Sequence, residues 1–310
     1  MKKIIALILS LCLIGLVGCA SADGSKKSVK VVCAAFSEYD WVKSIADPDK
    51  VSVTILADTG TDMHSYQPTA ADIAEISTAD LVVYNGGTAD KWMTDALKNS
   101  GNQKAGLRLM DVLADRLLCQ PEAGEHDHHE NHDNEMDEHV WLSLKNASIA
   151  CKAIYDRLVV LGGASEDGYA QYKARLNDLD LRYETALSDK NQTVVFADRF
   201  PFVYMFNDYN IGYYAAFPGC SSETDADFET VVSLANEMDR QKLNFVVIIE
   251  GSNSKLAQTI IDNTKNKNAT VVSLDSLQSV IQVQIKDGKS YLSAMEENLK
   301  VLKEVTQWHS

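Results

Sequence analysis

The chain lacks the short motifs that mark the common families of catalysts. An HExxH motif would indicate a zinc protease, GxSxG a serine hydrolase and a glycine-rich phosphate loop a phosphate-binding enzyme. None of the three occurs in this sequence. It has no basic stripe either, and its net charge is −15. That charge argues against nucleic acid or an anionic membrane surface as a partner. The negative net charge instead suits a protein that attracts small cations.

Cysteine is also scarce. Cys33, Cys119, Cys151 and Cys220 lie beyond the N-terminal region; they are too few and too scattered for a disulfide framework, and no CxxC pair indicates a zinc or redox motif. Some of them could pair outside the cytoplasm, and their spacing does not say which.

The N-terminus resembles a bacterial lipoprotein signal. Lys2 and Lys3 precede an apolar run from Ile4 to Val17, followed by Gly18 and Cys19, which is the pattern of an export signal over residues 1–18. A cysteine directly after Leu-x-Gly resembles the lipobox, which implies a lipid on Cys19 and an extracytoplasmic, membrane-anchored protein. Residues 19–28 then read as a flexible tether. The alternative is an ordinary secretory signal with a chance cysteine.

Histidine is concentrated in one tract. Residues 124–139 read GEHDHHENHDNEMDEH and hold five of the seven histidines: His126, His128, His129, His132 and His139. Imidazole with carboxylate is a ligand mix that suits zinc. The tract has no apolar periodicity before Val140, so we expect a loop over residues 124–138 whose histidines capture metal weakly. A purely solvated spacer is the alternative.

The remaining chain predicts an α/β fold of two lobes. Short β-branched runs alternate with amphipathic stretches, which is typical of parallel sheets covered by helices. The expected strands are Val29–Phe36, Val51–Ala57, Leu81–Asn85, Thr193–Ala197, Phe245–Glu250 and Ala269–Leu274. The expected helices are Tyr39–Ile45, Thr69–Thr78, Asp227–Lys242, Lys255–Lys265 and Tyr291–Thr306.

One long helix separates the two sets of strands. The apolar residues between Ser165 and Ser188 fall at spacings of three and four, which predicts a stiff helix about 30 Å long. We therefore predict an N-terminal lobe over 29–164, a linking helix over 165–189 and a C-terminal lobe over 190–310. Because the chain crosses between lobes once, the hinge should move little.

Two histidine motifs carry a family resemblance. Residues 60–69 read GTDMHSYQPT and residues 137–142 read DEHVWL. They resemble the DPHSYxPTPSD and DPHxW segments of the zinc/manganese substrate-binding lipoproteins of bacterial ABC importers, the ZnuA/TroA-like family. The resemblance implies metal ligands at His64 and His139, and at Asp275 at the end of a later strand. It covers nearly the whole chain beyond the signal.

Chemical reasoning agrees with these positions. His64 follows a strand and Asp275 ends one, and open α/β sheets bind ligands outside the carboxyl ends of their strands. His139 precedes the apolar Val140–Leu142, which can fix its position. We expect the metal site in the cleft between the lobes.

The sequence departs from the family at a third ligand. The segment that resembles VFHDAxGYF has Ala197 where the family usually has a third ligand, His or Glu. A zinc ion would need another donor to reach four-coordination. We rank Glu223 first, with water or a loop histidine as alternatives.

The predicted function is metal capture for import. We expect Zn²⁺ as the transported ligand, a permease and an ATPase as partners, and a monomer. The alternative cargoes are Mn²⁺ or Fe²⁺, because two histidines with two carboxylates form a harder site. A secreted zinc hydrolase is disfavoured. Glu138 is the candidate general base, but it is adjacent to His139, and adjacent side chains on a strand point in opposite directions. An added adhesin or sensing role stays open.

Overall fold

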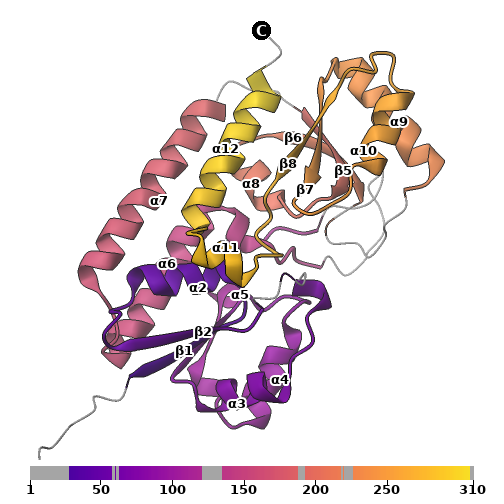
Figure 1. The fold of residues 1–310 in the computed structure, drawn as a ribbon. Coiled ribbons are helices and arrows are strands. Elements are labelled where there is room, and N and C mark those ends of the chain that lie inside the picture. The colour runs from indigo at the N-terminus through magenta and orange to yellow at the C-terminus, as the bar shows by residue number, and fades with distance from the viewer. Residues whose placement is uncertain are drawn as a thin grey trace, which may run out of the picture.

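A computed structural model describes residues 28–57, 60, 63–120, 135–187, 193–217, 219 and 226–307. These residues form two α/β lobes, with the N-terminal lobe at the bottom of Figure 1 and the C-terminal lobe at its upper right. Each lobe holds a sheet of four parallel strands flanked by helices. The predicted fold class is confirmed.

The N-terminal sheet has the order β2-β1-β3-β4, and every pairing is parallel. Its strands are β1 (Val29–Cys33), β2 (Val51–Ile55), β3 (Leu81–Tyr84) and β4 (Gly106–Arg108). The helices of this lobe are α2 (Phe36–Ile45), α3 (Ala70–Thr78), α4 (Lys91–Asn99), α5 (Leu109–Val112) and α6 (Leu144–Leu161). Parallel strands send their carboxyl ends to one edge, and the loop with His64 leaves β2 at that edge.

The C-terminal sheet repeats this arrangement with the order β6-β5-β7-β8, again all parallel. Its strands are β5 (Thr193–Arg199), β6 (Gly212–Phe217), β7 (Phe245–Ile249) and β8 (Thr270–Leu274). Its helices are α8 (Val203–Asp208), α9 (Phe228–Gln241), α10 (Lys255–Asn263), α11 (Gln282–Lys286) and α12 (Tyr291–Gln307).

The linking helix is α7 (Glu166–Leu187), which lies within the predicted range. It packs against α6, α2 and α12, and the same α12 also contacts α2 of the N-terminal lobe. The Tyr183 hydroxyl donates to the Met295 carbonyl oxygen at 2.6 Å, joining α7 to α12. One buried apolar cluster, including Trp41, Leu176 and Met295, therefore runs through both lobes.

Local chemistry explains the helix ends. The Thr69 hydroxyl accepts the Asp72 backbone N–H at the start of α3, and the Asp72 carboxylate accepts the Thr69 backbone N–H, which completes a capping box. Helix α6 begins at a Ser143 cap and ends at Gly162, whose φ of 76° is the left-handed geometry that glycine tolerates.

Candidate metal centre

His139 is the more deeply buried of the two predicted histidine ligands. It lies two residues after Asp137 and directly before a short 3₁₀ turn, Val140–Leu142, and its side chain has no exposed surface. Its Nδ1 lies 3.0 Å from Asp137 Oδ1, which also accepts its backbone N–H at 2.9 Å. With Nδ1–H directed at this carboxylate, Nε2 carries the lone pair that a metal requires.

His64 lies beside it. It belongs to a 3₁₀ turn, Met63–Ser65, between β2 and α3, and its ring centre is 5.7 Å from that of His139. Its Nδ1 lies 3.3 Å from Glu138 Oε1, and its side chain is 20% exposed. Both imidazoles thus have a carboxylate at Nδ1. The structure brings together two histidines that are 75 residues apart in sequence.

Glu138 is fixed by the loop that follows β3. Its Oε2 accepts the Ala89 backbone N–H at 2.9 Å, and its carbonyl oxygen accepts the Asn85 side-chain amide. A Cβ on Gly87 would lie 1.9 Å from Glu138 Oε2, so only glycine leaves room for this carboxylate. The contact with His64 was not predicted from the sequence, because residues 137–139 were expected to be extended and they do not form a strand.

Two further carboxylates are buried behind this contact. Asp90 accepts the backbone N–H groups of Asn85 and Gly86, both at 2.8 Å. Burial raises the pKa of Asp90 to about 6, and the Glu138 charge adds to the rise. Burial likewise raises the pKa of Glu38 to about 8, with a smaller contribution from Asp90. Two buried carboxyl groups with raised pKa values therefore lie on the N-terminal side of the site.

Asp275 lies directly after β8, and both of its carboxylate oxygens have partners. Oδ1 accepts the Leu277 backbone N–H at 2.9 Å, and Oδ2 lies 2.6 Å from Lys289 Nζ. Within the described ranges, no three histidine, cysteine or acidic side chains are arranged to hold a metal. The structure therefore pairs His64 with His139 and leaves Asp275 bound to a lysine.

The segment after Asp275 nevertheless contacts both histidine-bearing segments. The Trp141 indole N–H donates to the Ser276 carbonyl oxygen at 2.9 Å, and the Trp141 ring lies 5.2 Å from the His139 ring. A Cβ on Gly60 would lie 2.4 Å from Ile281 Cγ2, so the loop with His64 also packs on this segment. Figure 1 shows α11 where the lobes meet.

Ala197 supplies no donor, as the sequence indicated. It is 4% exposed and packs with Val195, Ile248 and the apolar faces of α9 and α10. Asp198 accepts the Ile249 backbone N–H at 3.1 Å within the sheet.

Several predicted site residues lie outside the described residues: Cys19, Glu223, His126, His128, His129 and His132. The described ends of the histidine tract are held side by side, because the Gln120 backbone N–H donates to Glu135 O at 2.9 Å and that of Asp137 to Leu118 O at 2.8 Å. The two described segments that flank residues 121–134 therefore lie next to each other, beside the segment with His139.

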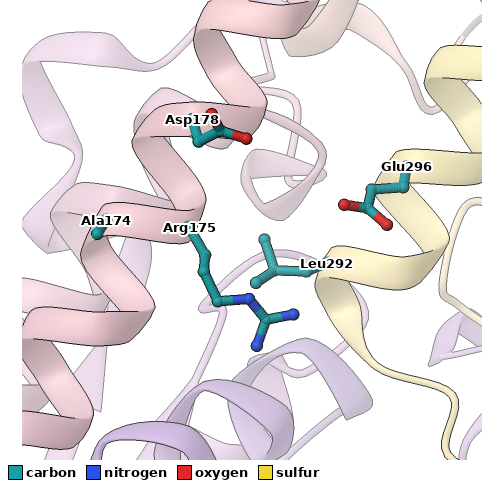
Figure 2. A pocket seen from close by; sticks show the side chains of 5 residues that line it. All are labelled: Ala174, Arg175, Asp178, Leu292 and Glu296. Atoms are coloured by element: carbon teal, nitrogen blue, oxygen red, sulfur yellow. The ribbon is translucent and has the colours of Figure 1, made fainter.

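Two open grooves lie away from these histidines. One, of about 320 Å³, runs between α7 and α12 and is lined by Arg175, Asp178, Leu292 and Glu296 with Ala174 (Figure 2). A second, of about 430 Å³, lies between α3 and α4 and includes Trp92 and Ile73. Neither contains a histidine, so neither competes with the pair as a metal site.

The sequence matches a known family over most of its length. The model of the ZnuA family, described as zinc-uptake complex component A, periplasmic, matches residues 31–305. The chain belongs to this family. The family resemblance drawn from the two histidine motifs is thereby confirmed.

Individual relatives agree with the family match. The chain is 30% identical over 314 residues to the zinc-binding lipoprotein AdcA of Streptococcus pneumoniae (strain ATCC BAA-255 / R6), covering 99% of this chain and 61% of that protein. It is 27% identical over 294 residues to the high-affinity zinc uptake system protein ZnuA of Bacillus subtilis (strain 168), covering 92% and 89%. This ZnuA-family chain therefore spans about three-fifths of AdcA and most of the Bacillus protein.

A solved structure supports the fold. The crystal structure of the Zn(II)-bound ZnuA-like domain of Streptococcus pneumoniae AdcA is 25% identical to this chain, with a TM-score of 0.70, and the match covers 90% of this chain and 99% of that one. In the part of the present chain that the structure describes, no helix is long and apolar enough to cross a membrane.

Proposed function

We propose that this chain is the extracytoplasmic binding protein of a bacterial ABC importer and that its cargo is Zn²⁺. The observation that carries the proposal is the pair of adjacent imidazoles, His64 and His139, each with a carboxylate at Nδ1. A carboxylate there orients the ring and raises the basicity of the other nitrogen, as in many zinc sites. The names of the AdcA and ZnuA relatives support zinc as the cargo.

In this proposal the lobes share the ion. His64 and His139 bind it from the N-terminal lobe, and Asp275 binds it from the C-terminal lobe. A water or Glu223 fills the fourth position, because zinc in proteins is usually four-coordinate. Since the donors come from both lobes, metal binding favours the closed arrangement, and parting the lobes releases the ion.

The histidine tract has an accessory role. His126, His128, His129 and His132 gather zinc weakly, since solvated imidazoles have no fixed geometry. The pairing of Leu118 and Gln120 with Glu135 and Asp137 supports this role, because both described flanks of residues 121–134 lie close to His139 in the chain or in space. A lipid on Cys19 anchors the protein to the membrane, where it delivers the ion to a permease driven by an ATPase.

Zinc titration of the mature chain tests the proposal. Competition against a chelator should show one tight site and several weak ones. His64→Ala should remove the tight site alone, because it deletes a fixed ligand. Deletion of residues 124–134, which keeps the Glu135 pairing, should remove the weak sites alone. His309→Ala serves as the histidine control and should change neither class.

Two outcomes would contradict the assignment. Loss of tight binding on deletion of the tract, with His64→Ala silent, would move the site to the tract. Tight Mn²⁺ binding with weak Zn²⁺ binding in the same assay would show that the cargo is Mn²⁺ and not Zn²⁺.

A further inference from the structure

The carboxylate proposed to bind metal from the C-terminal lobe already holds a cation. Lys289 Nζ lies 2.6 Å from Asp275 Oδ2, and the two side chains are only 17% and 22% exposed. Oδ1 is taken by the Leu277 backbone N–H at 2.9 Å. Each carboxylate oxygen keeps a second lone pair, but the Lys289 ammonium lies at Oδ2 and repels a metal ion that approaches the same oxygen. Of the two donors, the ammonium is the mobile one.

The backbone of Lys289 is fixed without help from this ion pair. Helix α11 ends in a glycine cap, in which Gly288 has a φ of 93° and donates to Ile285 O at 3.1 Å. The Lys289 backbone N–H donates to Gln284 O at 2.9 Å, which completes a Schellman motif. The ammonium is thus delivered from a defined position beside Asp275.

The backbone of Asp275 is fixed independently as well. The buried Asn298 side chain accepts the Asp275 N–H and donates to the Asp275 carbonyl oxygen, each at 2.8 Å. Nearby, Glu250 accepts the backbone N–H and the hydroxyl of Ser276, both at 2.7 Å. Two carboxylates therefore lie near each other, and Lys289 is the cation paired with Asp275.

We propose that Lys289 is a built-in competitor for the metal: it occupies Asp275 Oδ2 in the metal-free protein and is displaced when the ion binds. The proposal rests on the proposed function, with Asp275 as a ligand. The exchange replaces one positive charge by two beside Asp275 and Glu250, and it frees the ammonium to enter water. Lys289 thereby lowers the affinity for metal and keeps Asp275 neutralised until the ion arrives.

Removal of the ammonium tests the proposal directly. Lys289→Met should tighten zinc binding by about three- to tenfold, the range expected for a partly sheltered ion pair. Lys289→Arg keeps the cation and should bind zinc as the wild type does or more weakly. Lys286→Met removes the same charge from α11, where the structure gives Lys286 no ion pair among the described residues, and should change affinity less than twofold.

A double-mutant cycle separates competition from a general charge effect. In an Asp275→Asn background, Lys289→Met should leave zinc affinity unchanged, because the contested oxygen is gone. Weaker or unchanged binding by Lys289→Met alone, or equal tightening in both backgrounds, would overturn the proposal. Failure of the wild type to bind zinc would instead overturn the proposed function.

A measurement on the wild type covers the case in which a variant folds poorly. Acetylation by an amine-reactive ester, followed by mass spectrometry, reports how accessible each lysine is. Zinc should raise the labelling of Lys289 several-fold and leave that of Lys286 unchanged. Unchanged or reduced labelling of Lys289 in the zinc-bound protein would overturn the displacement.

Discussion

The two lobes share a strand order, since β2-β1-β3-β4 and β6-β5-β7-β8 both place the second strand outside the first. They differ in what they place at the carboxyl ends of those strands. The N-terminal lobe presents His64 and His139 with carboxylates at their Nδ1 atoms. The C-terminal lobe presents Asp275, whose Oδ2 forms an ion pair with Lys289. The same scaffold therefore carries one assembled half-site and one occupied half-site.

This difference indicates an order of events. On the N-terminal lobe a metal meets two imidazoles that are already oriented by carboxylates. On the C-terminal lobe, in the proposal above, it displaces an ammonium as it gains Asp275 as a ligand. We infer that the N-terminal lobe binds first and that the C-terminal carboxylate joins afterwards, which makes the histidines the larger source of affinity.

The largest expected effect tests this asymmetry. His139→Gln should weaken zinc binding by at least about a thousandfold, or about 4 kcal/mol, because it removes a fixed ligand from a fully buried position. Asp275→Asn should weaken it by only about tenfold, or about 1.4 kcal/mol, because the attraction between the ion and Asp275 is partly offset by the loss of the Lys289 ion pair.

Both variants are compared by chelator competition, with metal-free thermal unfolding as the control for folding. Equal losses, or a larger loss for Asp275→Asn, would show that the C-terminal lobe is the primary half-site and would reverse the comparison.

Much of the fold could be predicted from the sequence. The β-branched runs located β1, β2, β3, β5, β7 and β8 to within a few residues. Strand β4 has three residues, too few to show a period, and the aromatic run that forms β6 was not predicted as a strand. Helix α6 was missed although its Ser143 cap and terminal Gly162 were legible in the sequence.

The site was only half predictable. Motif resemblance placed His64 and His139, and the structure brings them together. The role of Glu138 was missed, yet the DPHxW pattern has proline where this chain has Glu138, and proline could not bind His64. The Lys289 contact could not be predicted, because it depends on how the glycine cap of α11 aims one lysine among many. The lobe boundaries, Glu223 and the tract histidines stay predictions.

The next effect concerns buried carboxylates in the two lobes. Glu250 has a hydrogen-bond donor at each oxygen, whereas Glu38 Oε2 has none among the described residues. The pKa of Glu38 is about 8 in the folded protein against a usual value of 4.5, so the folded state keeps a proton that the unfolded chain releases. The free energy of unfolding should therefore fall as pH rises from about 4.5 to 8.

Glu38→Gln should remove that part of the pH dependence. With about 1.4 kcal/mol for each pH unit, we expect the variant to gain roughly 4 kcal/mol over the wild type between pH 5 and pH 8.5. Urea unfolding in the presence of a chelator at several pH values measures the difference. Parallel curves for the two proteins would mean that Glu38 is ionised in the folded state.

The smallest effect compares the two carboxylates that orient the histidines. Asp137 and His139 are both fully buried, and their contact is 3.0 Å; Glu138 and His64 are 4% and 20% exposed, and theirs is 3.3 Å. Water can reach His64 and replace a lost partner at Nδ1, but it cannot reach His139. Asp137→Asn should therefore weaken zinc binding by about ten- to a hundredfold, and Glu138→Gln by less than about tenfold.

Chelator competition gives both values, and nitrogen NMR of the imidazoles reports whether Nδ1 keeps its proton. A greater loss for Glu138→Gln, with the Nδ1 proton of His139 retained in Asp137→Asn, would show that the longer and more exposed contact controls the site.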